Sequence, residues 1–582
     1  MFRSFVHPFM ITIFKKSYYF ILSLPIYFIS FQANAQQKSF ISSITAQNQW
    51  MDSVYDKMSL RQRVAQMIFV RAHTNRGQAY SDSVGQVIKN EHLGGVVFFQ
   101  GGPGRQLNLS NTYQKLSDVP LLIAMDGEWG LGMRLDSTLS FPYQMTLGAI
   151  RDNNLIYKMG QEVARQFKRL GMHINFAPDM DVNNNPANPV INYRSFGDDK
   201  VNVAQKGIAY MQGMQSEGLI TTAKHFPGHG DTNVDSHQDL PQLPFTRQRL
   251  DSLEEYPFKQ AIAAGISGVM VAHMNIPALD PTPKLPSTLS RPIITGLLKD
   301  SLGFKGLVVS DAMEMKGVVK YFPNGEADVK AFIAGNDILE LSENSKRADK
   351  LIRKAIHKGL VSEQEFEARV KKILAAKYWA GLNHYQPANP ENFSQEINTP
   401  EAKQLIQTLA DAAVTLLKGD SLINAFDPAK STAIISIGAD VLTPFQQELG
   451  HYFTNSKVMM VPKDMQVPMM RAFMNGLKEY QQIIVSTHDS RLRPGSKLDY
   501  SSNLKLFIAE LAAMPNTAIS VFANPYTIAG LPGIEKAGAL IVGYQKDDFM
   551  QRAAAKVLSK QLKPSGKLPV TINTFFTTGM GL

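Results

Sequence analysis

Apolar residues between positions 49 and 378 fall into short runs separated by longer amphipathic stretches. Stretches such as 156–169 and 201–218 have the spacing of helices that bury one face. The β-prone runs cover residues 67–70, 95–99, 121–125, 173–176, 220–223, 268–272, 306–310 and 337–341. About eight strand–helix units predict a (β/α)₈ barrel of the TIM type over residues 45–385. A doubly wound open sheet is the alternative architecture.

The pattern is interrupted and then restarts in the last third of the chain. Residues 381–400 are rich in Asn, Pro and Gln, which predicts a linker at 386–400. Further apolar runs follow at residues 433–437, 458–461, 483–486, 518–522 and 540–543, again between helical stretches. This alternation predicts a three-layer αβα sandwich with a mostly parallel sheet over residues 401–575. The expected fold class is therefore α/β throughout.

The first 35 residues have the features of a secretion signal. Lys15 and Lys16 precede an apolar run at 17–31, and Ala33-Asn34-Ala35 forms a small-x-small cleavage site. We expect residues 1–35 to be removed and the mature protein to be exported, periplasmic or secreted, without stable membrane insertion. An uncleaved N-terminal anchor is the alternative.

Composition narrows the possible functions of this 582-residue chain. It contains no cysteine, which excludes disulfides, thiol catalysis and a lipoprotein-type lipid anchor. The formal net charge is +10, but the basic residues are spread along the chain without a Lys/Arg block. We therefore expect no nucleic-acid partner. A moderate basic excess suits a protein near the anionic polymers of a cell envelope.

Polar side chains follow the ends of the predicted strands. In a (β/α)₈ barrel the active site lies where the strands end. The residues in these positions are Asp126, Asp179, Asp181, Lys224, His225, His273 and Asp311, and Glu340 lies within the last strand. The barrel interpretation therefore predicts a catalytic site built from them.

The densest cluster of such groups is the segment 224–237, KHFPGHGDTNVDSH. Its proline and glycines interrupt regular structure and force a loop. Asp235 and His237 can form a carboxylate–imidazole pair, because side chains two residues apart share a face in an extended loop. Alternatively, metal ligands could come from this segment, namely His225, His229, Asp231 and His237. The spacings match no standard zinc signature, which favours the pair.

This segment resembles the signature of the β-N-acetylglucosaminidases of glycoside hydrolase family 3. The similarity runs from about residue 49 to residue 573 and includes PSGKLPVT at 564–571, as in two-domain bacterial members. The resemblance implies a retaining β-N-acetylhexosaminidase whose catalytic residues all lie on the barrel. The second domain is then expected to be supportive.

The resemblance also assigns catalytic roles. Asp311, in SDAMEM at 310–315, corresponds to the nucleophile, although Ala312 stands where many relatives have a second Asp. His237 corresponds to the acid/base, oriented by Asp235, since an imidazole can donate and retrieve a proton near neutral pH. His229 is the rival proton donor in the same loop.

Five residues match the positions that bind the sugar in the family, namely Asp126, Arg134, Arg194, Lys224 and His225. At Glu128-Trp129 the sequence differs from the Gln-Glu-Gly motif that is commoner in the family. The resemblance therefore defines the local sugar contacts less well. His273 and Glu340 are expected in the pocket without an assigned role.

The sequence thus predicts an exo-acting β-N-acetylglucosaminidase for cell-wall fragments or chitooligosaccharides, with no metal and no organic cofactor. A phosphorylase that uses the same residues is a first alternative, because a neutral histidine does not repel phosphate. A β-glucosidase of the same family and a non-catalytic wall-binding protein are the others. Substrate-assisted hexosaminidases are disfavoured, because their Asp-Glu pair is missing from the sequence.

Overall fold

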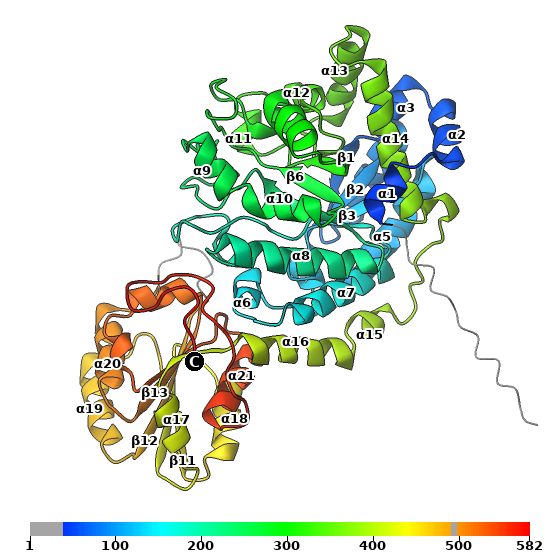
Figure 1. Ribbon diagram of the computed structural model, residues 1–582. Helices are drawn as coiled ribbons and strands as arrows, with labels where there is room; N and C mark the ends of the chain where they lie inside the picture. The colour runs from blue at the N-terminus through cyan, green and yellow to red at the C-terminus, as the bar shows by residue number, and fades with distance from the viewer. Residues whose placement is uncertain (1–38, 491–497) are drawn as a thin grey trace, which may run out of the picture. The chain divides into compact units, whose positions relative to one another are not determined.

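The computed structural model describes residues 39–490 and 498–582, so the predicted signal peptide lies outside the described residues. The described part contains two separate β-sheets with helices around each (Figure 1). None of the helices in these two ranges combines the length and apolar character that crossing a bilayer requires.

The first sheet is a barrel of eight strands in the order β7-β6-β5-β4-β3-β2-β1-β8. All neighbouring strands are parallel, and a bridge between Val309 and Ile338 links β7 to β8 and closes the ring. The strands are β1 (Ile68–Ala72), β2 (Gly95–Phe98), β3 (Leu122–Met125), β4 (Ile174–Asn175), β5 (Ile220–Phe226), β6 (Gly268–Val271), β7 (Leu307–Ser310) and β8 (Leu339–Glu340). The predicted barrel is confirmed, and the open-sheet alternative is wrong for this region.

Helices follow the strands and cover the outside of the barrel (Figure 1). The main ones are α4 (Gln78–Glu91), α5 (Pro103–Leu116), α7 (Asn153–Arg169), α8 (Lys200–Ser216), α10 (Tyr256–Ala263), the π-helix η4 (Pro292–Ser301), α12 (Glu326–Ala334), α13 (Ser345–His357) and α14 (Glu363–Trp379). Before the barrel come α1 (Phe40–Ile44), α2 (Gln49–Lys57) and α3 (Leu60–Ala65).

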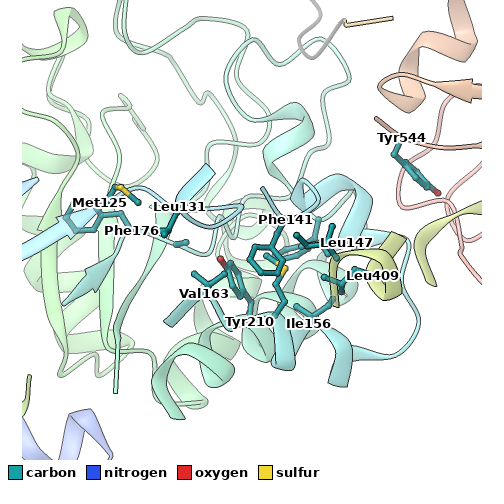
Figure 2. Close-up of a cluster of buried hydrophobic side chains, with 14 of the residues drawn as sticks. Met125, Leu131, Phe141, Leu147, Ile156, Val163, Phe176, Tyr210, Leu409 and Tyr544 are labelled. Atoms are coloured by element: carbon teal, nitrogen blue, oxygen red, sulfur yellow. The ribbon is translucent and has the colours of Figure 1, made fainter. Parts of the chain in front are cut away.

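Helices α7 and α8 pack with their backbones almost in contact. A Cβ atom on Gly213 would lie 2.0 Å from the carbonyl oxygen of Tyr157, so only glycine fits there. Figure 2 shows buried side chains of this region, including Val163 of α7 and Tyr210 of α8. The Tyr210 hydroxyl donates a hydrogen bond to the carbonyl oxygen of Gly127 at 3.0 Å. This contact ties α8 to the loop that follows β3, where the site residues begin.

The second sheet has six strands in the order β11-β10-β12-β13-β14-β9. They are β9 (Thr415–Lys418), β10 (Thr432–Ile437), β11 (Ser456–Val461), β12 (Gln482–His488), β13 (Thr517–Phe522) and β14 (Ala539–Val542). The helices are α16 (Pro400–Ala413), α17 (Asp420–Ala425), α18 (Pro444–Tyr452), α19 (Val467–Leu477), α20 (Ser502–Ala512) and α21 (Asp548–Leu558). The predicted mostly parallel sheet is confirmed, and β9, antiparallel to β14, is an addition to it.

The segment predicted as a linker, residues 386–400, has contacts of its own with the barrel. It contains the short helix α15 (Phe393–Ile397). Arg169, in the last turn of α7, donates hydrogen bonds to the carbonyl oxygens of Asn389 at 2.7 Å and Glu391 at 2.6 Å. The segment is therefore held against α7, and the domain boundaries at its two ends stay predictions.

Candidate active site

The strand ends of the barrel surround one cavity of about 330 Å³. Seven of the eight residues selected from the sequence line it, namely Asp126, Arg134, Arg194, Lys224, His225, His237 and Asp311. The eighth, Asp235, is hydrogen-bonded to His237. Because these residues come from β3, β5, β7 and the loops between them, the closed ring of strands is what brings them together.

A buried network of charges forms one wall of the cavity. Lys224 bridges two carboxylates, with its Nζ 2.8 Å from Asp126 Oδ1 and 2.8 Å from Glu128 Oε1. Arg134 contacts Asp126 Oδ2 at 2.5 Å, and Arg194 binds Glu128 through two nitrogens. Each buried charge thus has a partner, as burial of ions requires.

The network keeps both carboxylates ionised. Burial alone would raise the pKa of Asp126, but Lys224 and Arg134 reverse this effect and lower the pKa below its ordinary value. Burial acts on Glu128 in the same direction, and Arg194 with Lys224 lowers the pKa of Glu128 to about 2. An ionised Asp126 is an acceptor for sugar hydroxyls.

Glu128 is a site residue whose role the sequence reasoning missed. It holds two of the predicted sugar-binding cations, Lys224 and Arg194, although it does not itself line the cavity. The available signal was its place two residues after Asp126, behind the end of β3. Its pairing partners lie far away in the sequence, so the pattern alone did not reveal them.

Asp181 orients the beginning of the segment 224–237. Its Oδ2 accepts a hydrogen bond from His225 Nδ1 at 2.7 Å, and its Oδ1 accepts one from the backbone N–H of His229 at 2.6 Å. Arg194 lies 3.3 Å from His225 Nε2. Because a guanidinium only donates, Nε2 is the acceptor and the proton of the neutral ring lies on Nδ1, toward Asp181. Asp179 beside it has a pKa well above the ordinary value, through burial and the charge of Asp181.

Asp235 and His237 form the pair that the sequence predicts. Asp235 Oδ1 accepts from His237 Nδ1 at 2.8 Å and from the backbone N–H of His237 at 2.9 Å. The His237 side chain is 62% exposed, whereas that of Asp235 is 24% exposed. With Nδ1 held by the carboxylate, Nε2 is the ring nitrogen left for proton exchange with a substrate.

His229 has no such freedom. Its Nδ1 lies 2.8 Å from Thr232 Oγ1 and its Nε2 lies 3.2 Å from Ser236 Oγ. Burial, with the nearby His225, lowers the pKa of His229 to about 4, so its ring is neutral at neutral pH. These contacts favour His237 over His229 as the proton donor.

Asp311 lies directly after β7 and is ionised. Its Oδ1 accepts a hydrogen bond from the backbone N–H of Ala312 at 2.8 Å. Burial would raise the pKa of this carboxyl, but His273 and His225, together with the Ala312 amide and His237, lower it. His273 is buried behind it and contacts the carbonyl oxygen of Ala312 at 3.0 Å. A carboxylate kept ionised in a partly buried position suits nucleophilic attack.

The metal site considered for the segment 224–237 is not supported by its geometry. His225 contacts Asp181, His229 contacts Thr232, His237 contacts Asp235, and Asp231 pairs with Arg249 at 2.9 Å. Within residues 39–490 and 498–582, the one group close enough to share an ion is Asp179, Asp181 and His225. Within the described residues, these four side chains therefore do not converge on a common point.

An aromatic wall completes the cavity. The rings of Trp129 and Tyr193 lie 6.0 Å apart, and Tyr143 packs edge-on against both of them. Tyr526, which follows β13 of the second sheet, packs in the same cluster. Its hydroxyl accepts a hydrogen bond from Asn183 at 2.9 Å. The second sheet thus supports the wall.

Comparison with known proteins decides the family. Residues 59–376, more than half of the chain, match the family described as "Glycosyl hydrolase family 3 N terminal domain". The chain belongs to glycoside hydrolase family 3. It is a glycoside hydrolase with a carbohydrate substrate, and the resemblance to the hexosaminidase branch is confirmed.

Relatives of this family 3 enzyme include hexosaminidases from several bacteria. It is 29% identical over 406 residues to β-hexosaminidase A of Pseudoalteromonas piscicida, and this alignment covers 64% of this chain and 67% of the relative. It is 26% identical to a β-N-acetylglucosaminidase/β-glucosidase of Cellulomonas fimi, over 63% of this chain and 66% of that one. Each alignment thus spans about two thirds of the relative.

The structures give longer matches. A family 3 β-N-acetylglucosaminidase from Paenibacillus superposes with a TM-score of 0.73 at 30% identity, covering 89% of this chain and 99% of that one. A β-glucoside phosphorylase superposes with a TM-score of 0.76 at 21% identity, covering 91% of this chain and 97% of the other. The second similarity shows the fold alone.

Proposed function

We propose that this family 3 enzyme is an exported, retaining exo-β-N-acetylglucosaminidase that releases terminal β-linked GlcNAc. The observation that carries the proposal is that the ionised Asp311 and the exposed imidazole of His237 line one cavity, and that the Asp235 carboxylate is hydrogen-bonded to this imidazole. Retention needs a nucleophile on one face of the sugar and a proton donor on the other.

The chemistry follows from these groups. Asp311 attacks the anomeric carbon while His237 protonates the leaving oxygen, which gives a glycosyl-enzyme and the released aglycone. Water then enters, His237 removes its proton, and attack at the anomeric carbon frees Asp311. Asp235 orients the imidazole and stabilises its charged form, in the same way as the aspartate of a serine-protease triad.

The sugar is held by the buried network. Ionised Asp126 accepts hydrogen bonds from the sugar hydroxyls. The other predicted sugar-binding residues line the same cavity, namely Arg134, Arg194, Lys224 and His225. Because these groups are already paired with one another, they are fixed in place before the substrate arrives. The similarity to the β-N-acetylglucosaminidase from Paenibacillus supports GlcNAc as the sugar.

The proposal includes export and a cell-wall or chitin-derived substrate. The proposal of export rests on the sequence of residues 1–35. It is tested by measuring the mass of the protein recovered outside the cytoplasm. We expect the mass of a chain that begins at Gln36. A full-length mass there would contradict cleavage and favour the anchor.

A phosphorylase is the second candidate. The specific observation in its favour is that the proposed acid/base is a histidine, which is neutral after proton donation and admits a phosphate anion. The proposed function is tested with an aryl β-N-acetylglucosaminide beside the matching β-glucoside, each with and without phosphate.

The expected result is a preference for the acetamido sugar of about 10-fold or more in kcat/KM, with free GlcNAc released. GlcNAc-1-phosphate as the product would instead establish the phosphorylase with the same residues. A preference for the glucoside would assign the enzyme to the β-glucosidases, and no turnover of either substrate would favour the wall-binding protein.

A further inference from the structure

Strands β8 and β1 contribute two further polar residues to the cavity. Glu340 of β8 pairs in register with Phe69 of β1, and Arg71 lies two residues further along β1. Both Glu340 and Arg71 line the cavity. Glu340 is only 3% exposed. A carboxyl group buried to this extent is costly unless it has a polar partner.

Within the described parts of the chain, neither residue uses its full hydrogen-bonding capacity. Glu340 Oε2 and Arg71 Nε are both buried and have no hydrogen-bond partner there. The other end of the Arg71 guanidinium is occupied, because it contacts Glu314 Oε1 at 2.6 Å. The carboxylates of Asp126 and Glu128, by contrast, are paired with cations across the cavity. Unused donors and acceptors in a substrate cavity are positions for substrate atoms.

Glu340 faces charges from four strands. Burial raises its pKa well above the ordinary value, and the carboxylates of Asp126 and Asp311 add to this effect, against Lys224 and Arg71, which lower it. This shift favours the protonated form of Glu340, while Asp311 is ionised. A neutral carboxyl group can donate a hydrogen bond, and the Arg71 Nε–H is a second donor.

We propose that Glu340, as an O–H donor, and Arg71, through its Nε–H, together bind one acceptor oxygen of the terminal sugar. This inference rests on the proposed function. Two oxygens of a GlcNAc unit have the required chemistry, namely the carbonyl oxygen of the acetamido group and the oxygen of the hydroxymethyl group. Glu340 would then be a substrate-binding residue of the cavity.

Two variants separate donation from mere filling of space. Glu340→Gln keeps donors and similar size, whereas Glu340→Leu has none. We expect kcat/KM for an aryl β-N-acetylglucosaminide to fall about 3-fold in Glu340→Gln and about 30-fold in Glu340→Leu. Asp328→Asn is the matched control, because Asp328 is also a buried carboxyl, with its pKa raised to about 6 by burial, but it does not line the cavity.

The control should stay within about 2-fold of the unmodified enzyme. Equal losses in Glu340→Gln and Glu340→Leu would overturn the proposal, as would a loss in Asp328→Asn as large as that in Glu340→Leu.

The pH profile gives a readout that a structural role would not change. With an activated aryl leaving group, kcat/KM does not require a proton from His237. Below the raised pKa of Glu340 the donor is present, and above it the donor is lost and a second negative charge faces Asp311. We expect an alkaline decrease in kcat/KM that is absent in Glu340→Gln. The same decrease in both proteins would contradict the proposal.

Three aryl substrates identify the oxygen. The aryl β-N-acetylglucosaminide has both candidate oxygens. The β-glucoside lacks the acetamido group, and the 6-deoxy N-acetylglucosaminide lacks the hydroxymethyl oxygen. The loss caused by Glu340→Leu should disappear with whichever substrate lacks the bound oxygen, and an equal loss on all three would contradict the proposal. If the unmodified enzyme hydrolyses none of them, the proposed function itself is refuted; an active enzyme with the wrong variant pattern refutes only the role of Glu340.

Discussion

Replacing Asp311 with Asn should lower kcat by about 10⁴-fold or more while substrate binding persists. The carboxylate is the group that forms the covalent bond, and an amide of the same shape cannot replace it. Against the effect of burial, the neighbouring His273 and His225 hold the pKa of Asp311 below its ordinary value, so the native side chain is ionised and the wild-type enzyme needs no activation step. Initial rates with an aryl substrate and inhibitor binding by calorimetry measure the two effects separately.

Two comparisons sharpen this test. Asp300→Asn changes an exposed carboxyl on η4 and should leave kcat within about 2-fold. In Asp311→Gly, added azide should restore turnover and give the α-glycosyl azide, because the small anion attacks from the face that Asp311 leaves empty. Activity of Asp311→Asn near the wild-type value would remove Asp311 from the mechanism.

Replacing His237 with Ala should have an effect that depends on the leaving group. For chitobiose or an alkyl glycoside, whose leaving oxygen needs a proton, we expect kcat/KM to fall by about 10²- to 10⁴-fold. For a dinitrophenyl glycoside, which leaves as a stable anion, the loss in kcat/KM should stay below about 10-fold. The exposed position of the imidazole, whose Nδ1 is held by Asp235, is consistent with a group that meets the leaving oxygen.

The comparison of substrates contains its own control. His357→Ala removes an exposed imidazole on α13 and should change neither rate. Equal losses on both substrates in His237→Ala would mean that the imidazole holds the loop instead of donating the proton. His229→Gln would then be the next variant, although both nitrogens of that ring already have partners.

Much of the fold could be predicted from short-range pattern. Each of the eight predicted barrel strands overlaps an observed one, because buried parallel strands consist of short apolar runs between helical stretches. β9 escaped prediction because Thr415–Lys418 directly follows the apolar helix α16, without a turn signal between them. Its antiparallel pairing with β14 joins residues far apart in the chain, which a local pattern does not reveal.

The site could be predicted only in part. Strand-end position selected Asp126, Lys224 and Asp311, because a barrel brings strand ends together whatever the loops do. The role of Glu128 depends on which cations the folded chain brings to it. The spacing of residues near Glu128 in the sequence does not predict these partners. The choice between His229 and His237 likewise rests on burial and ring contacts, which only the three-dimensional arrangement supplies.

The central claim is a glycosyl-enzyme on Asp311, and the most direct test is to trap it. The enzyme is treated with a 5-fluoro β-N-acetylglucosaminyl fluoride, which forms the covalent adduct quickly and hydrolyses slowly, and the digested protein is analysed by mass spectrometry. We expect one sugar per chain, attached to Asp311. A label on another residue, or no label from a reagent that the enzyme turns over to the inverted anomer, would contradict it.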